Sequence, residues 1–142
     1  MKPLFSTSDL FDTFGDSCQL CETQFRQYGL CTVFSGKIRT VKCSGDNVLL
    51  RRLLETKSES EALVVDGSGY LGSGLMGSTL AELALKNGWV GAVILGAVRD
   101  VNALHTLTFG IKSQKEREAW GRPGRRRVIR WCNFCPGPMD LQ

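Results

Sequence analysis

The sequence predicts an α/β domain with a mixed sheet, and three observations support that class. Two apolar runs, residues 62–65 and 90–98, are typical of strands covered on both faces. A glycine-rich turn and an apolar-faced helix separate them, so residues 62–98 form a βαβ unit with parallel strands and a right-handed crossover. An earlier segment, residues 32–43, alternates β-branched side chains with Lys and Arg, which indicates a strand with one solvated face.

The first half of the chain also contains two predicted helices. Residues 7–12 have a short helical pattern, with Thr7 or Ser8 as its cap. A polar, cysteine-containing stretch follows as far as Gly29. The pair Asp46-Asn47 is expected to cap a helix that ends near residue 57. In that helix, apolar and charged side chains lie on opposite sides.

The βαβ unit has recognisable start and stop signals. The turn Asp66-Gly67-Ser68-Gly69 ends its first strand. Thr79 to Glu82 fits a capping box at the start of the helix, and Asn87-Gly88 is a helix stop. After Lys112 the sequence predicts neither a strand nor a helix.

The charge is divided unevenly between two regions. Residues 1–111 carry 10 Lys and Arg against 11 Asp and Glu, whereas residues 112–142 carry 8 against 3. We therefore expect a domain over residues 1–112 and a basic, atypical tail over 113–142. Because the excess positive charge belongs to the tail, the net charge of +4 gives no information about the charge of the domain's ligand. No apolar run reaches the roughly 20 residues of a membrane span, and the N-terminus lacks a signal peptide's apolar stretch. The expectation is a cytoplasmic protein.

The carboxyl ends of the two predicted parallel strands carry the candidate site. One strand ends at Asp66 and the other at Arg99-Asp100, and ligands of α/β sheets bind beyond such ends. Arg99 offers a bidentate donor to a carboxylate or phosphate, and Asp100 offers a hard oxygen for Mg²⁺ or Mn²⁺. The helix starting near Ser78 or Thr79 presents free N–H groups to an anion. These features predict a metal-assisted, anion-binding pocket that could hold a 2-oxo acid, although the Arg-Asp pair is also compatible with a surface ion pair or a helix cap.

Several short motifs occur in an order and spacing that identify a family. They are Thr7-Ser8-Asp9-Leu10 with Asp12, Phe34-Ser35-Gly36-Lys37-Ile38-Arg39-Thr40-Val41-Lys42, Asp46-Asn47, Val64-Val65-Asp66-Gly67 with Gly69, Gly77-Ser78-Thr79-Leu80 with Ala81-Glu82-Leu83-Ala84, Asn87-Gly88-Trp89, and Gly96-Ala97-Val98-Arg99-Asp100-Val101. With them, residues 7–112 resemble the RraA-like family, which comprises regulators of ribonuclease activity A and 4-hydroxy-4-methyl-2-oxoglutarate aldolases. The chain departs from the family pattern at Gly45, Ser68 and Leu71-Gly72-Ser73, and throughout the segment after Lys112.

The resemblance implies a layered β/β/α domain that assembles as a homotrimer, with active sites near subunit boundaries. It implies a metal-dependent aldolase or decarboxylase that cleaves 4-hydroxy-4-methyl-2-oxoglutarate-type 2-oxo acids, and oxaloacetate, to pyruvate. The matching positions assign substrate binding to Gly77, Ser78, Thr79, Leu80 and Arg99, catalysis to Arg99, and the Mg²⁺ or Mn²⁺ ligand to Asp100. Because some members bind and inhibit an endoribonuclease, the alternative is a non-catalytic trimeric regulator.

Three other features suggest chemistry less directly. Cys18 and Cys21, with Cys132 and Cys135, have the spacing of two zinc half-sites, but the halves lie much farther apart than the about 15–20 residues of a zinc ribbon. The arginine-rich run 122–130 could bind RNA phosphates only weakly and without sequence choice, so a nucleic-acid partner is not expected. The single histidine, His105, is more typical of a structural or exposed residue than of a catalytic one.

Overall fold

A computed structural model describes residues 6–116. Its strands are β1 (Arg26–Tyr28), β2 (Ile38–Lys42), β3 (Ala62–Asp66), β4 (Gly74–Met76), β5 (Gly91–Val98) and β6 (Gly110–Glu116). Its helices are α1 (Thr7–Phe14), α2 (Val48–Leu54), α3 (Ser78–Lys86) and α4 (Val101–Leu104), and a 3₁₀ turn, η1 (Gly15–Ser17), follows α1. The predicted α/β class is confirmed. None of these helices is long and apolar enough to span a membrane.

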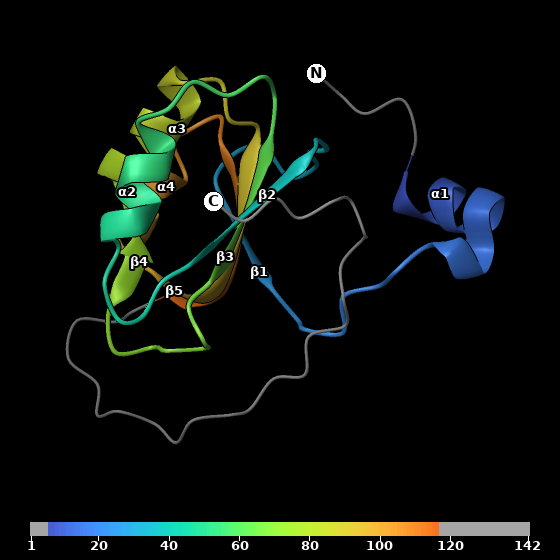
Figure 1. Cartoon of the computed structure of the whole chain (residues 1–142), viewed down its shortest axis with the longest axis horizontal. Coiled ribbons are helices and arrows are strands. Elements are labelled where there is room, and N and C mark those ends of the chain that lie inside the picture. Colours follow the sequence, from blue (N-terminus) through green and yellow to red (C-terminus); the bar gives the residue numbers. More distant parts are fainter. Residues whose placement is uncertain (1–5, 117–142) are drawn as a thin grey trace.

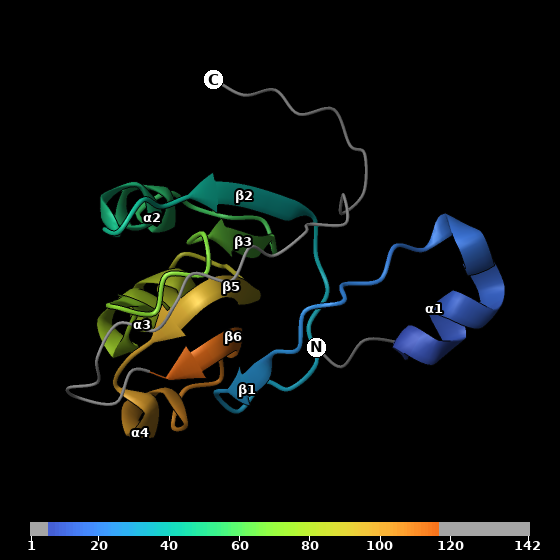
Figure 2. The same ribbon diagram turned by 90° about the horizontal axis from the view of Figure 1, so that it is seen from below.

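All the strands of this region belong to one mixed sheet, which has the order β1-β6-β5-β3-β2 with β4 paired to β5. The pairs β2–β3, β3–β5 and β5–β6 are parallel. The edge strand β1 runs antiparallel to β6. The predicted βαβ unit is therefore present as β3-α3-β5. Helices α2, α3 and α4 lie on one side of the sheet, while α1 lies apart on the opposite side (Figures 1 and 2).

The hydrophobic core lies between the sheet and the three helices on that side. Strand residues that face this layer alternate with residues that face away from it, as the pleat requires. Thus Leu63 and Val65 are fully buried, while Val64 between them is partly exposed. The helices contribute apolar side chains such as Leu50, Leu54, Ala81 and Ala84.

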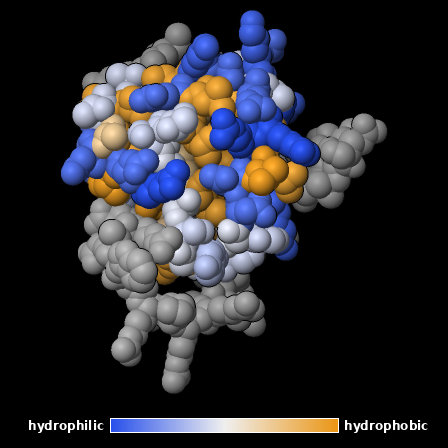
Figure 3. Space-filling view, turned by 90° about the vertical axis from the view of Figure 1, so that its left-hand side faces the viewer, coloured by the Kyte–Doolittle hydropathy of each residue, from blue (hydrophilic) through white to orange (hydrophobic). Residues whose placement is uncertain are grey.

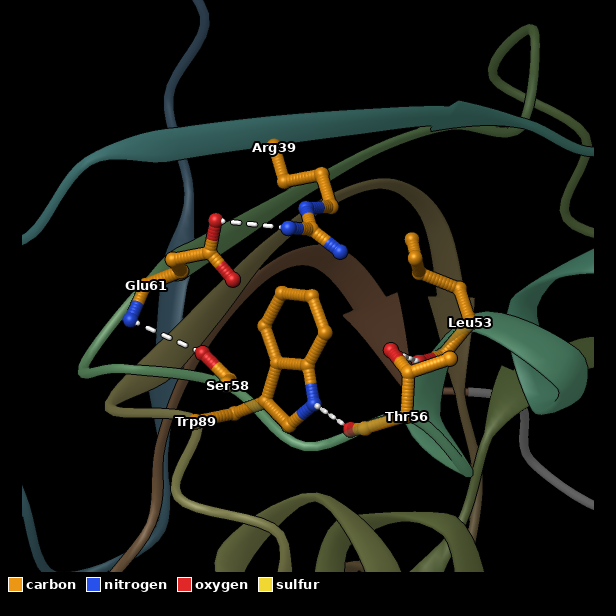
Figure 4. Close-up of polar contacts among 6 residues, drawn as sticks. All are labelled: Arg39, Leu53, Thr56, Ser58, Glu61 and Trp89. Carbon is orange, nitrogen blue, oxygen red and sulfur yellow. Dashed lines mark hydrogen bonds and ion pairs between the residues drawn. The ribbon is translucent and has the colours of Figure 1, made fainter. Parts of the chain in front are cut away.

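A tryptophan anchors the crossover helices at the amino ends of the strands (Figure 4). Trp89 is 2% exposed, and its Nε1 donates a hydrogen bond to the Thr56 carbonyl at 3.3 Å. The Arg39 guanidinium lies 5.6 Å from the centre of the ring, a cation–π distance. Arg39 also forms a 2.9 Å ion pair with Glu61. These contacts connect β2 to the segments that precede β3 and β5.

The predicted strand at 32–43 is shorter than expected, because β2 covers only Ile38–Lys42. The preceding segment links β1 to β2, which are the two edge strands, and its Phe34 lies against β5 and β6 between them. There the Phe34 ring packs so closely over Gly91 and Gly110 that neither position has room for a Cβ atom. Strand β1, within the polar stretch before Gly29, was not predicted. The expectation of no strand after Lys112 was wrong, since β6 continues to Glu116.

The helix caps also differ from expectation. Helix α1 begins with a capping box between Ser6 and Asp9, and not with Thr7 or Ser8 as the cap. Hydrogen bonds from the Ser6 amide and hydroxyl hold the pKa of Asp9 below its usual value. At α2 the expected cap is present in part: Asp46 Oδ1 accepts from the Val48 amide at 3.0 Å, whereas Asn47 donates its side-chain amide to the Leu75 carbonyl.

We predict that Trp89→Ala destabilises the domain by about 3–5 kcal/mol, because it removes a buried ring and leaves a cavity. Urea denaturation followed by circular dichroism measures the change. The matched control is Leu85→Ala, an exposed position on α3, for which about 1 kcal/mol or less is expected. Equal stability of the two variants would contradict the anchoring role of Trp89.

Candidate functional site

Three segments that are distant in sequence meet at the carboxyl end of β5. Strand β4, inside the predicted glycine-rich turn, pairs with the last residues of β5, with Gly74 opposite Ala97 and Met76 opposite Val98. The Arg99 amide continues the ladder by donating to the Met76 carbonyl at 3.0 Å. Helix α3 starts directly after β4. The first turn of α3 is thereby held beside Arg99 and Asp100.

Glycine is required where β4 and α3 approach β5. A Cβ atom on Gly77 would lie 2.6 Å from Asp100 Oδ2 and 3.1 Å from Arg99 Nε. A Cβ atom on Gly74 would lie 2.8 Å from the Arg99 Cβ. Gly77 itself has a φ of −126°, which any residue can adopt, so its requirement is steric. The structure therefore brings Gly77, Arg99 and Asp100 together, as the strand-end argument expected.

Asp100 occupies a strained backbone position. Its φ of 58° and ψ of 41° lie in the left-handed region, which costs a residue with a Cβ atom free energy and is frequent at functional sites. This conformation turns the chain sharply from β5 into α4. Its Oδ2 atom receives two long hydrogen bonds of 3.4 Å, from the Ser78 amide and the Ser78 hydroxyl.

The capping box predicted at Thr79 is wrong. Gly77 is the N-cap of α3 and provides no side-chain hydrogen bond. The Asp100 carboxylate, 22 residues farther along the chain, faces the first amide instead. Ser78, Thr79 and Leu80 form the first turn, whose amides have no acceptor within the helix. Thr79 is exposed, whereas the Leu80 side chain is buried, so Leu80 could meet a ligand only through its backbone.

Arg99 and Asp100 are accessible to a ligand and only weakly paired with each other. Their side chains are 64% and 47% exposed, and Arg99 Nε lies 3.9 Å from Asp100 Oδ2. At that distance and exposure an ion pair contributes little to stability. The arrangement places a cationic fork, the positive end of a helix and an exposed carboxylate next to one another.

The donor set fits a hard divalent cation that retains most of its water. Within residues 6–116 no group of three or more His, Cys, Asp or Glu side chains could hold a metal ion. Magnesium, however, is commonly bound through one or two carboxylates plus water and substrate oxygens. The exposed Asp100 carboxylate, with both of its hydrogen bonds long, satisfies that requirement.

The remaining candidates lie elsewhere. His105 ends α4, where its ring tilts against Tyr28 at 6.0 Å between centroids. Cys18 and Cys21 lie in the segment after η1, while Cys132, Cys135 and the arginine-rich run lie outside the described residues. Burial raises the pKa of the Cys43 thiol, and the nearby Asp46 and Asp66 carboxylates add to this effect.

The structure adds Met76, which sequence reasoning missed, and gives Gly74, one of the glycines expected to let the backbone approach a ligand, a role in positioning Arg99. Met76 accepts the Arg99 amide through its carbonyl, and Gly74 leaves room for the base of the Arg99 side chain. Both roles belong to the backbone, so no side-chain chemistry indicated them. The available signal was the spacing of Gly74 and Gly77 just before a helix start.

We predict that Gly77→Ala destabilises the domain by about 1–3 kcal/mol, because its methyl group would overlap the Asp100 carboxylate. Thermal or urea denaturation measures the effect. Thr79→Ala, an exposed neighbour, serves as the control and should change stability by about 0.5 kcal/mol or less. If Gly77→Ala is as stable as the unmodified protein, the close approach described above is incorrect.

Comparison with known proteins places this geometry in a family. Residues 6–129 match the model of the RraA-like family, described as Aldolase/RraA, so the match extends beyond Lys112. One similar crystal structure is described as an S-adenosylmethionine:2-dimethylmenaquinone methyltransferase from Geobacillus kaustophilus. It shares 36% identity and a TM-score of 0.77 over 89% of this chain and 81% of that one.

A second similar structure is described as the RNA-processing inhibitor RraA from Thermus thermophilus. It shares 34% identity and a TM-score of 0.75, over 79% of this chain and 68% of that one. The family description and the two structures carry three different functional names on one fold. The family match and the structure described as RraA support one conclusion: this chain belongs to the RraA-like family.

Proposed function

We propose that the protein is a divalent-metal-dependent aldolase or decarboxylase that releases pyruvate from 2-oxo acids. The observation that carries the proposal is the placement of exposed Arg99 and Asp100 beside the first turn of α3. A fold shared by proteins with different names does not select an activity. The choice therefore depends on what these side chains can do.

Each group has a distinct task toward a substrate with two carboxylates, such as oxaloacetate or 4-hydroxy-4-methyl-2-oxoglutarate. The amides of Gly77, Ser78, Thr79 and Leu80, at the positive end of α3, receive one carboxylate. The Arg99 guanidinium binds the 2-oxo acid end through its planar fork. When the carbon–carbon bond breaks, the electron pair passes into the 2-oxo acid as an enolate, and Arg99 offsets the charge that develops.

Asp100 would hold the cation, with water completing the coordination. A bound Mg²⁺ or Mn²⁺ would supply Lewis acidity toward the 2-oxo carbonyl. With oxaloacetate, the bond between the third and fourth carbons breaks, carbon dioxide leaves, and the enolate takes a proton from water to give pyruvate. The assembly that we propose is a homotrimer in the cytoplasm, and a neighbouring subunit could cover the exposed side of the site.

We predict that the purified protein releases pyruvate from oxaloacetate in the presence of Mg²⁺ and loses this activity in EDTA. Arg99→Ala should lower kcat/KM about 100-fold, as expected for the loss of a charged group that stabilises a developing anion. Arg99→Lys should recover part of the loss, because it keeps the charge without the fork. Asp100→Asn should raise the Mg²⁺ concentration needed for half-maximal rate.

The assay couples pyruvate to lactate dehydrogenase and subtracts the protein-free rate measured with Mg²⁺. Lys86→Ala, an exposed position at the far end of α3, is the control and should leave turnover unchanged. An Arg99→Ala protein that turns over at the unmodified rate, or a protein without metal-dependent turnover, would refute the enzymatic proposal.

The second candidate is a non-catalytic regulator that binds and inhibits an endoribonuclease. The similarity to the structure described as an RNA-processing inhibitor favours it. For this function we predict dose-dependent inhibition of endoribonuclease cleavage of a labelled RNA, with Arg99→Ala as inhibitory as the unmodified protein. Inhibition without pyruvate release would support the regulator function in place of the aldolase function. Absence of inhibition at micromolar protein would exclude the regulator function.

A further inference from the structure

Strand β2 forms one edge of the sheet, and its outer side has no partner strand within residues 6–116. In a parallel pair, every second residue directs both its amide and its carbonyl to the same neighbouring strand. The Lys37 carbonyl and the Cys43 amide both bond to β3. The odd-numbered residues of this segment therefore face β3, and the amides and carbonyls of Ile38, Thr40 and Lys42 point away from it. Such a row of unpaired backbone groups is a template for another strand.

The surroundings of this edge are basic. Residues 37–57 contain six Lys and Arg against two Asp and Glu. Lys37 directly precedes β2 and Lys42 ends it, and both are exposed. Neither lysine forms an ion pair with the described residues, whereas Arg39 between them is engaged with Glu61. The unpaired cations therefore lie at the two ends of the strand.

Helix α2 extends this surface on the helix-bearing side of the sheet. It packs against β2 and lies beside it in Figure 2. Val48 and Leu49 are 52% and 55% exposed. Arg51 makes a 3.5 Å ion pair with Glu55, whereas the exposed Arg52 forms none with the described residues. The helix-bearing side of the molecule shows such hydrophobic groups between hydrophilic ones (Figure 3). We call the outer side of β2 and the exposed side of α2 together the β2 edge surface.

We propose that the β2 edge surface binds an extended, acidic peptide segment of another protein, which adds to the sheet as a strand beside β2. The main chain of the segment would bond to the outward amides and carbonyls of β2, and such bonds supply the affinity in this mode of recognition. Its acidic side chains would face the lysines at the ends of β2. Apolar side chains on the helix side of the added strand would lie next to Val48 and Leu49.

The charges decide which strand can pair with this edge. Lysines and a short length are common means of preventing edge strands from pairing with copies of themselves. Pairing of β2 with β2 of a second copy would bring the lysines of both chains together, and like charges across strands are destabilising. An acidic strand converts the same charges into attraction. The edge is therefore protected from copies of this chain and remains available to an acidic partner.

Single-stranded RNA fits this surface less well than a peptide does. Proteins that bind single strands combine a basic groove with aromatic side chains on which bases stack. Residues 37–57 contain no Phe, Tyr or Trp. The outward backbone groups of β2 alternate donors and acceptors along an extended strand, which a peptide strand matches and a nucleic acid does not. These observations favour the peptide.

Titration of the full-length protein with defined peptides tests the proposal, and its readout does not depend on the proposed activity. The probe is a fluorescent peptide of about eight residues, a common strand length, in which Glu alternates with Val or Thr. A control peptide carries Lys in place of every Glu. In fluorescence anisotropy the acidic peptide should bind at least about tenfold more tightly than the lysine peptide, because only the acidic peptide complements the edge.

Two N-methylated versions of the acidic peptide separate strand addition from attraction by charge. Each version is methylated at every second amide, one version at the odd positions and the other at the even positions. Only one of these two sets of amides can face β2, since successive residues of a strand alternate. One version should therefore bind about tenfold more weakly than the unmethylated peptide, and the other should bind as the unmethylated peptide does.

Variants of the chain locate the contact. Thr40→Pro removes an outward amide and no bond to β3, and proline is tolerated on edge strands. It should weaken binding of the acidic peptide about tenfold, whereas Thr40→Ala, which keeps the amide, should not. Lys42→Glu with Arg52→Glu should also weaken binding about tenfold. Lys86→Glu, an exposed position at the far end of α3, is the charge control. Circular dichroism verifies that each variant is folded.

Amide exchange gives a direct readout of strand addition in the unmodified protein. The Thr40 amide should exchange with deuterium at least about tenfold more slowly when the acidic peptide is bound, because a new hydrogen bond protects it. Nuclear magnetic resonance measures this exchange residue by residue. The Val41 amide, which already faces β3, serves as the internal reference and should change much less.

Three outcomes would overturn the proposal. The first is an acidic peptide that binds no more tightly than the lysine peptide. The second is equal binding of the two N-methylated peptides together with unchanged exchange of the Thr40 amide, which would show attraction by charge without an added strand. The third is a single-stranded oligouridylate that binds more tightly than the acidic peptide and loses affinity in the variant with Lys42→Glu and Arg52→Glu. That result would assign the surface to a nucleic acid.

Discussion

Backbone pairing of β5 is the constraint on which the rest of the structure depends. This strand, Gly91–Val98, is bonded to β3 on one side, to β6 on the other, and to β4 near its end. Its two glycines leave no room for side chains, because Phe34 covers Gly91 and Leu75 covers Gly96. Where the β5–β6 register shifts, the buried Ser113 hydroxyl donates to the Gly96 carbonyl at 2.8 Å. The strand is thus packed on all sides and fixes where Arg99 emerges.

The geometry of the candidate site depends on the position of β5. Because β4 pairs with the end of β5, α3 begins directly after its N-cap Gly77, beside Arg99 and Asp100. The same pairing places the positive end of α3 opposite a strained aspartate. A functional group on a turn after a central strand is held more rigidly than one on a long loop. Here the backbone positions the groups, and the glycines permit their approach.

The sequence predicted those elements whose hydrophobic pattern is contained in one long, continuous segment. The β3-α3-β5 unit was predictable because its strands are unbroken apolar runs, and the rule for strand ends then located Arg99 and Asp100. Strand β4 was not predictable, because its three residues form a strand by pairing with the end of β5, more than 20 residues farther along the chain. Strand β1 likewise depends on β6, more than 80 residues away. The capping box at Thr79 failed for a related reason, since the carboxylate facing α3 comes from Asp100.

The loose contacts of Asp100 bear on how a ligand could enter. Its ion pair with Arg99 spans 3.9 Å and its hydrogen bonds to Ser78 are 3.4 Å long. An exposed pair at such distances is worth about 1 kcal/mol or less, so separating these groups costs little. A buried ion pair with short hydrogen bonds would oppose the binding of a cation or of a substrate with two carboxylates, because either ligand would have to break the pair. Because the opposite charges are adjacent but scarcely bonded, the proposed binding of a carboxylate and a cation requires only that these two side chains separate, and no helix or strand has to unfold.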